Sequence, residues 1–179
     1  MTRAIAHFGD AVHAVLPFLA AGGKPRQFMR GFYSDVLIPY PSLPKSKLKK
    51  HDYYTTPEAL RIVACWNYIV AVIRAADSCQ FEPTMFNGRR PDLLLTHAAK
   101  TLIVEIKTYK RKVPKHIGRH PRRQVLYPLE HLRKQSDKPE NIGGFVLYLS
   151  GHLKVPLDPY WMDIENIPKR CEPPLPLIG

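Results

Sequence analysis

Two acidic residues and one lysine have the types and the spacing needed to act together on a phosphate. In the segment RRPDLLLTHAAKTLIVEIKTYKRK, Asp92 precedes one apolar run, whereas Glu105 and Lys107 lie near the end of the next. Charged groups beside segments that become buried are costly unless they are paired or bind an ion. The positions of these three charges therefore suggest a functional site.

Pairing between two strands is needed to bring the three side chains together. The tetrapeptide HAAK, residues 97–100, separates the two apolar runs and is expected to form a four-residue loop between antiparallel strands. Asp92 then lies directly opposite Glu105, and paired residues point to the same face of a sheet. Lys107 lies two residues beyond Glu105 and points to that face as well. A shift of one residue in the pairing would separate them.

Two neighbouring carboxylates repel each other unless a cation lies between them. Mg²⁺ or Mn²⁺ suits this position, because Mg²⁺ takes oxygen ligands and keeps several waters. The backbone carbonyl near Ile106 could add a ligand, and Lys107 could orient or deprotonate a water or balance charge on a phosphate. Metal-assisted hydrolysis of a phosphodiester needs these parts. The plain alternative is that Asp92 is only a turn residue after Pro91 and that Glu105 and Lys107 lie on an exposed strand.

The chain is strongly basic. Its 179 residues include 27 Lys and Arg against 15 Asp and Glu, which gives a formal charge of +12. Such a balance favours a nucleic-acid partner, with an anionic membrane surface or simple solubility as the alternatives. The cations near the three charged residues are expected to contact phosphates without reading sequence; they are Lys110, Arg111, Lys112, Lys115, Arg119, Arg122 and Arg123.

Cysteines and apolar runs indicate the compartment. The three cysteines are scattered and form no CxxC, so a disulfide framework or a structural zinc site is not expected. A reducing, cytoplasmic setting fits best. Charged and polar residues interrupt the most apolar stretch, residues 59–76, so no membrane span is predicted. The N-terminal stretch reads as an amphipathic helix rather than as a signal peptide, because Asp10 and His13 lie inside it.

The predicted elements alternate helices with strands, which indicates a single α/β domain. We expect helices at residues 3–20, 57–76 and 120–134, the last bent at Pro128, and strands at residues 80–86, 90–95, 101–109 and 143–149. Asn87-Gly88 is predicted to close a two-residue hairpin. That register would pair Glu82 with Leu93 and turn Glu82 away from Asp92. The domain plan is an N-terminal helix and basic arm over 1–55, a core over 56–152 and a Pro-rich tail without regular structure over 153–179.

At these residues the chain resembles the PD-(D/E)xK nuclease superfamily, with Pro91-Asp92 as the first half of the motif and Glu105-Ile106-Lys107 as the second. The resemblance covers about residues 56 to 150. It implies a restriction-endonuclease-like core, in which a helix, a three-strand meander, a helix and a final strand build a mixed sheet flanked by helices. It also implies Mg²⁺-dependent cleavage of DNA.

Within the superfamily, the chain is most similar to archaeal Holliday junction resolvases. The matching features are a hairpin at Asn87-Gly88, a glutamine opening the next helix at Gln124, and Gly143-Gly144 before the last strand. That family carries an acid early in its first helix, which implies Glu58 as a metal ligand, and the match implies that Gln124 assists catalysis. Gln124 and Tyr127 also approximate a pair found in RecB-type nucleases. The N-terminal extension, the tail and the loop at 109–119 depart from the family.

The sequence leaves several alternatives open. A protein of nuclease fold that only binds or scaffolds nucleic acid would carry the same basic surface, and a membrane-surface protein would bind anionic vesicles without a metal. DNA is the expected substrate, but the sequence does not separate DNA from RNA, branched from linear substrates, or endonuclease from exonuclease action. A homodimer is plausible because cutting two strands usually needs two sites.

Overall fold

A computed structural model describes residues 8–24, 57–109, 113–152, 156–166 and 169–177. The helices are α1 (Phe8–His13), α2 (Leu16–Ala20), α5 (Pro57–Arg74) and α6 (Arg119–Gln135), with one-turn 3₁₀ helices η2 (Phe86–Gly88) and η3 (Pro139–Asn141). The strands are β1 (Ser78–Phe81), β2 (Leu93–His97), β3 (Lys100–Tyr109), β4 (Ile142–Ser150), β5 (Tyr160–Asp163) and β6 (Arg170–Cys171).

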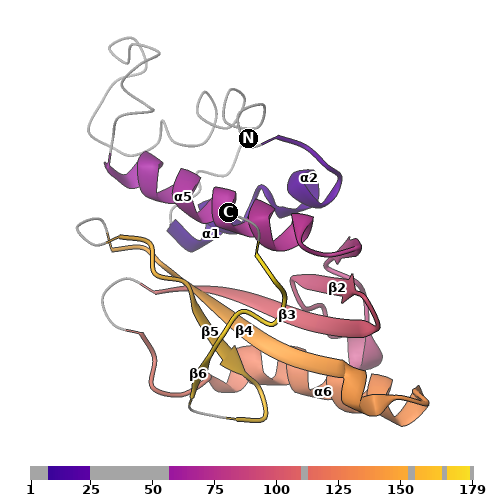
Figure 1. The fold of residues 1–179 in the computed structure, drawn as a ribbon. Coiled ribbons are helices and arrows are strands. Elements are labelled where there is room, and N and C mark those ends of the chain that lie inside the picture. Colours follow the sequence, from indigo (N-terminus) through magenta and orange to yellow (C-terminus); the bar gives the residue numbers. More distant parts are fainter. Residues whose placement is uncertain (1–7, 25–56, 110–112, 153–155, 167–168, 178–179) are drawn as a thin grey trace.

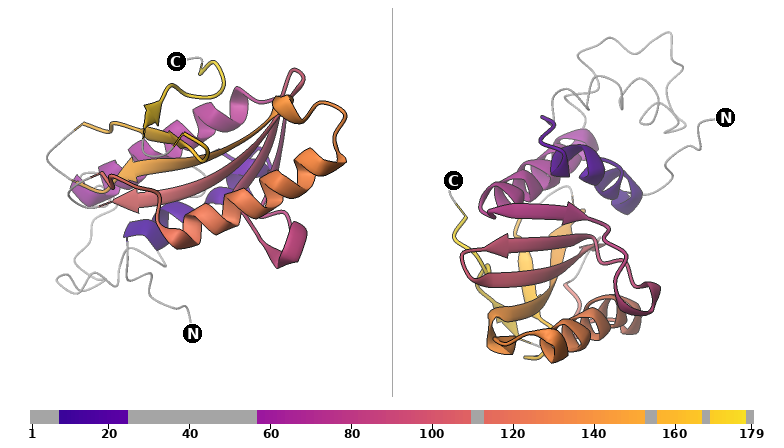
Figure 2. Two further views of the ribbon diagram at one scale, coloured as in Figure 1. Left: turned by 90° about the horizontal axis from the view of Figure 1, so that it is seen from below. Right: turned by 90° about the vertical axis from the view of Figure 1, so that its right-hand side faces the viewer.

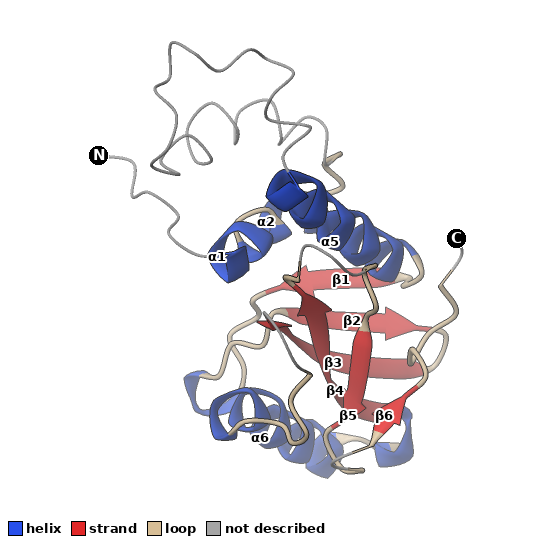
Figure 3. Cartoon of the chain, turned by 90° about the vertical axis from the view of Figure 1, so that its left-hand side faces the viewer, coloured by secondary structure: helices blue, strands red, loops and turns tan. Residues whose placement is uncertain are grey.

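The described strands form one six-stranded mixed sheet in the order β1-β2-β3-β4-β5-β6 (Figure 1). Neighbouring strands are antiparallel, except that β3 and β4 run parallel after the α6 crossover. Helices α1, α2 and α5 cover one face and α6 covers the other (Figure 3). The α/β class is confirmed, as is the predicted order of helix, three strands, helix and strand.

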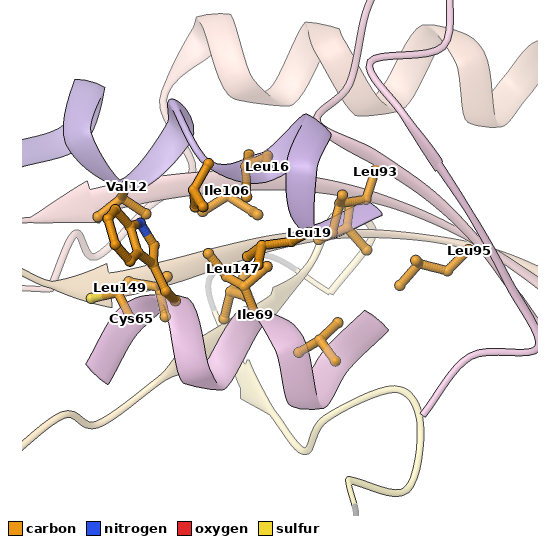
Figure 4. Packing of buried hydrophobic residues seen from close by; sticks show 14 of the residues in the cluster. Val12, Leu16, Leu19, Cys65, Ile69, Leu93, Leu95, Ile106, Leu147 and Leu149 are labelled. Carbon is orange, nitrogen blue, oxygen red and sulfur yellow. The ribbon is translucent and has the colours of Figure 1, made fainter. Parts of the chain in front are cut away.

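The main core lies between α5 and the sheet. Apolar residues recur along α5 at the three- and four-residue spacing of one helix face, and this face is fully buried: Ile62, Cys65, Trp66, Ile69 and Val72. The same cluster takes in the apolar sides of α1 and α2 (Figure 4). Leu175 also belongs to it. Among the described residues, no helix is long and apolar enough to cross a membrane.

The N-terminal helix is broken where one continuous helix was predicted. The structure has α1 ending at His13 and α2 beginning at Leu16, while residues 3–7 lie outside the described part of the chain. Pro17 explains the break, because it has no N–H to donate to the carbonyl of His13, and its ring crowds the preceding turn. At the start of a new helix the missing N–H costs nothing. The predicted end of the helix at residue 20 is confirmed, and Gly22, two residues later, has a φ of 84°.

The β2–β3 hairpin has the predicted register but a shorter loop. His97 pairs with Lys100 and Leu93 with Val104, so the loop is the dipeptide Ala98-Ala99 rather than four residues. Ala98 has a φ of 52°, a left-handed conformation that is unfavourable for a residue with a Cβ. Its backbone N–H donates a 2.6 Å hydrogen bond to Oδ2 of Asp77, which fixes the turn.

The β1–β2 connection differs from the predicted two-residue hairpin. Strand β1 ends at Phe81, and the connection runs through η2, where Asn87 and Gly88 both have positive φ (57° and 66°). Pro83 explains the early end, because proline offers no N–H to a strand ladder. Phe81 consequently pairs with Leu93, which shifts the register by one residue from the predicted one.

The C-terminal segment extends the sheet instead of forming an irregular tail. Strand β5 pairs antiparallel with β4, and β6 pairs with β5. Trp161, Met162 and Ile164 from this segment are buried. The prediction of an irregular tail was wrong because it rested on the prolines in this segment. Proline is tolerated next to short edge strands.

Helix α6 approaches β4 closely because of Gly144. A Cβ at this position would lie 2.6 Å from Cγ1 of Val125 and 3.1 Å from Cδ2 of Leu129, both on α6. Real Cβ atoms essentially never come as close as 2.6 Å to another atom, and 3.1 Å is tighter than most real Cβ contacts. The glycine therefore sets the distance between α6 and the sheet, and with it the position of the residues that α6 presents.

We expect Gly144→Ala to lower the free energy of unfolding by about 1–3 kcal/mol, because the added methyl group overpacks the α6–β4 contact. Chemical denaturation measures this loss. Val125→Ala removes the nearest methyl groups, so the two changes together should cost less than the sum of the single losses. Fully additive losses would contradict this account of the contact.

Candidate functional site

An open pocket with a volume of about 420 Å³ lies where β2 begins and β3 loses its neighbour. Helix α1, the β1–β2 connection, β3 and the start of α6 supply its walls. The pocket contains four of the residues predicted to act in catalysis: Asp92, Glu105, Lys107 and Gln124. The predicted β2–β3 pairing brings Asp92, Glu105 and Lys107 together, and α6 adds Gln124.

Asp92 occupies the position at which β2 stops covering the edge of β3. The residue is 6% exposed, and its Oδ2 accepts a 2.6 Å hydrogen bond from the backbone N–H of Ile106. The carboxylate therefore replaces a missing strand partner. The N–H and C=O of one residue project to the same side of a strand, so the Ile106 carbonyl faces the same open edge.

Glu105 is buried next to Asp92 and is only partly satisfied. The residue is 3% exposed, its Oε1 lies 2.8 Å from Nζ of Lys107, and its Oε2 is buried without a hydrogen-bond partner among the described residues. Burial and then the negative charge of Asp92 raise the pKa of Glu105 to about 7, although Lys107 opposes this rise. At neutral pH this carboxyl group is therefore partly protonated when no cation is bound.

His13 is a site residue that the sequence reasoning missed. Its Nδ1 lies 3.2 Å from Oδ1 of Asp92. Burial is the largest effect on His13 and opposes the charged form, but the hydrogen bond and the charge of Asp92 together raise its pKa. Asp10, one turn earlier on α1, lines the same pocket. No local sequence pattern predicts the contact between His13 and Asp92, because it depends on how α1 packs against β3.

Helix α1 lies close to β3 because of a glycine. A Cβ at Gly9 would lie 2.9 Å from Oγ1 of Thr108, and both residues line the pocket. Gly9, one turn before His13, is the one sequence feature that indicates a close approach of α1 to another element.

Glu82 lies in the pocket, which corrects the prediction that it faces away. Its backbone N–H donates to the carbonyl of Asp92, and its side chain pairs with Arg90 at 2.9 Å. The one-residue shift in the β1–β2 register is the reason, since it turns Glu82 to the face that carries Asp92. Arg90 and His120 also line the pocket.

The other predicted residues divide into described and undescribed ones. Glu58 lies in the first turn of α5, but its side chain is outside the described part of the structure, as are Lys110, Arg111 and Lys112. Lys115, Arg119 and Arg122 are exposed, and Arg123 is half-buried. The last three belong to the first turns of α6, next to Gln124.

The pocket's oxygen atoms suit a hard divalent cation. Two carboxylates, one with an unpartnered buried oxygen, lie beside a strand edge that presents the Ile106 carbonyl. Mg²⁺ is usually held by one or two carboxylates and keeps waters for the remaining positions. Among the described residues, no group of three or more His, Cys, Asp or Glu side chains is placed to hold a metal ion.

Comparisons of this chain with protein-family models, with curated proteins and with solved structures found no match.

We expect Glu105→Gln to stabilise the metal-free protein at high pH. The folded pKa of about 7 exceeds the ordinary value of 4.5, so the folded state holds this proton more tightly than the unfolded state. The stability from this group is then complete below about pH 4.5 and is lost as the pH rises to about 7. In EDTA at about pH 8, the variant should exceed the wild type by about 1–3 kcal/mol.

The measurement is the free energy of unfolding against pH in EDTA, with Glu140→Gln as a control that removes an exposed carboxylate. His13 is present in both proteins, and the charge of Glu105 is the smallest of the effects on its pKa, so the difference between wild type and Glu105→Gln comes mainly from Glu105 itself. A difference that stays constant across this pH range would contradict the assigned pKa.

Proposed function

We propose that the chain is a metal-dependent nuclease that hydrolyses phosphodiester bonds of nucleic acid, with DNA as the expected substrate. The observation that carries the proposal is the pair of buried carboxylates, Asp92 and Glu105, beside Lys107 at one open strand edge. Burying two neighbouring carboxylates destabilises a fold unless a cation offsets their repulsion. The formal net charge of +12 supports a polyanionic substrate.

Asp92, Glu105 and the Ile106 carbonyl would hold Mg²⁺ or Mn²⁺, and Glu58 is a further proposed ligand by resemblance. When bound, such an ion supplies positive charge to a phosphate and makes water more acidic. Asp92 is oriented for this role by the Ile106 N–H, which leaves Oδ1 directed towards His13. Glu105 would give up the proton that its raised pKa retains at neutral pH.

Lys107 and Gln124 would act on the substrate directly. Lys107 is one-third exposed, so its ammonium group can leave Glu105 for a phosphate oxygen within the same pocket. The amide of Gln124, on the opposite wall, can accept from and donate to the attacking water. His13 would release Asp92 or hold it in place as the charge in the pocket changes.

The same contacts also support a second function, the binding of nucleic acid without cleavage. In the structure, His13 and Ile106 contact Asp92, and Lys107 contacts Glu105. Internal pairing of this kind also suits a nuclease-fold protein that binds nucleic acid without cutting it. An assay of binding and cleavage with the same substrate separates the two functions.

The finer proposal, by resemblance to the resolvases, is a homodimeric endonuclease specific for branched DNA. A panel of four-way junctions, linear duplexes and single strands, with and without Mg²⁺, tests it. Paired cuts in junctions by a dimer would support it. Preferred cutting of linear or single-stranded substrates would remove the subfamily assignment and leave the nuclease proposal intact.

We expect Asp92→Asn to lower the cleavage rate by at least about 100-fold, because the amide has lost the charge that a hard cation requires. The Asn side chain can still accept a hydrogen bond from the Ile106 N–H and can still contact His13, so folding should be preserved. Binding should be retained or strengthened, since the phosphate contacts lie elsewhere and one repulsive charge is gone. Single-turnover cleavage and gel-shift affinity measure the two effects.

Asp137→Asn makes the same change of charge at an exposed position beyond the end of α6 and should leave cleavage unchanged. Melting temperatures in EDTA control for folding. Normal cleavage by Asp92→Asn would remove the proposed site. Binding by the wild type without cleavage in any divalent metal would favour the binding-only function.

We expect nucleic-acid affinity to fall steeply with salt and to depend on the start of α6. Each phosphate contact contributes about −0.9 to the slope of log K against log salt on duplex DNA. Replacing Arg122 and Arg123 with Gln should therefore reduce the slope by about 1–2 and weaken binding to all sequences alike. Replacing the exposed Lys100 and Lys138, which lie far from this turn, makes the same change in net charge as a control. An equal effect of both pairs would contradict a localised phosphate track.

A further inference from the structure

A second, smaller pocket lies beside the candidate site. Its walls come from two of the segments that also line that site, the β1–β2 connection and α6. Its volume is about 230 Å³, and it is lined by Phe86, Asn87, Tyr127, Glu130, His131 and Lys134. The first two come from η2 in the β1–β2 connection, which also supplies Glu82 and Arg90 to the candidate site. The other four come from α6. Both views of Figure 2 show the η2 segment extending from the sheet beside α6.

One stripe of α6 connects the two pockets. His120 and Gln124 line the candidate site, whereas Tyr127, His131 and Lys134 line the second pocket. These residues follow one another at three- and four-residue intervals, so they share one helix face. From Gln124 to His131 the helix rises about 10 Å, which is about three nucleotides of one stacked strand at ~3.4 Å each.

Phe86 gives the second pocket its aromatic surface. Phe86 is 43% exposed and is one of two large hydrophobic residues that are exposed among the described residues. Its ring stacks on His131 with the ring centroids 4.2 Å apart and the planes 10° from parallel. His131 thus fixes the orientation of the ring on one side, while the exposed part of Phe86 remains open to a ligand.

The surroundings of Phe86 are polar and cationic, which suits a nucleotide better than an aliphatic ligand. The guanidinium of Arg89 lies 5.4 Å from the centroid of the Tyr127 ring and joins η2 to α6. Lys134 can reach a phosphate from the end of the stripe. The Asn87 amide and the Glu130 carboxylate can pair with the hydrogen-bonding edge of a base.

We propose that this second pocket binds one unpaired nucleobase of the strand that the candidate site cuts, by stacking it on Phe86 about three nucleotides from the reacting phosphate. The proposal rests on the proposed nuclease function and specifies its substrate as nucleic acid that is single-stranded at this position. Bases within a duplex stack on one another and are not free to stack on a side chain. Unpaired bases stack readily on aromatic rings, whatever their sequence.

Equilibrium binding in EDTA tests the subsite without cleavage. The probes are a fluorescein-labelled single strand of mixed sequence and a strand of equal length in which every base is replaced by an abasic sugar. The wild type should bind the base-bearing strand about 5- to 100-fold more tightly than the abasic strand. Phe86→Ala should abolish that preference by weakening only the base-bearing complex, and it should leave duplex affinity unchanged.

Two further variants separate stacking from general effects. Phe86→Trp keeps an aromatic ring and should retain the preference for bases. Leu60→Ala removes the other exposed large hydrophobic side chain, which lies on α5, and should also retain it. A single strand carrying 2-aminopurine gives a readout that needs no variant, because stacking on Phe86 should quench its fluorescence when the wild type binds.

Equal affinity of the wild type for the base-bearing and abasic strands would overturn the subsite, and binding of both strands would leave the nuclease proposal standing. Equal weakening of both strands by Phe86→Ala would also overturn it, because Phe86 would then only support the loop. Failure of the wild type to bind any strand or duplex would overturn the subsite and the nuclease proposal together.

Discussion

The register of the β2–β3 hairpin is the constraint on which the candidate site depends. The Ala98-Ala99 turn pairs Leu93 with Val104, and the same register continued by one residue places Asp92 opposite Glu105. A shift of one residue would send one of them to the other face of the sheet. The turn holds Ala98 at a φ of 52°, which costs energy for alanine. The hydrogen bond from the Ala98 N–H to Asp77 and five pairs of β2–β3 residues offset that cost.

The open edge of β3 gives the site its chemistry. Because β2 begins only at Leu93, the Ile106 N–H has no strand partner on that side and binds the Asp92 carboxylate instead. The two layers of helices then complete the site from opposite faces, with α1 presenting His13 and α6 presenting Gln124. Two buried carboxylates and a lysine lie together because β3 extends past the start of β2.

Local patterns predicted the α/β class, α5, the central strands and the β2–β3 register, because apolar periodicity and a short turn fix those features within the segment itself. They failed at two prolines inside predicted elements and at one contact between distant residues. Pro83 ends β1 early and brings Glu82 into the pocket, Pro17 breaks the N-terminal helix, and His13 reaches Asp92 only through tertiary packing. The strands β5 and β6 lie in a Pro-rich segment whose composition gave no sign of pairing. The catalytic roles themselves remain proposals.

Calorimetric titration of Mn²⁺ tests most directly whether Asp92 and Glu105 form a cation site. In buffers of different ionisation heat, the wild type should bind Mn²⁺ and release a proton at about pH 6, and release little at about pH 8, because the Glu105 carboxyl group has a pKa of about 7. Glu105→Gln should weaken binding by at least about 10-fold and reduce the proton release at about pH 6, leaving only the part that comes from His13, whose pKa Asp92 raises. Absence of Mn²⁺ binding by the wild type, or equal binding and proton release by the variant, would contradict the account.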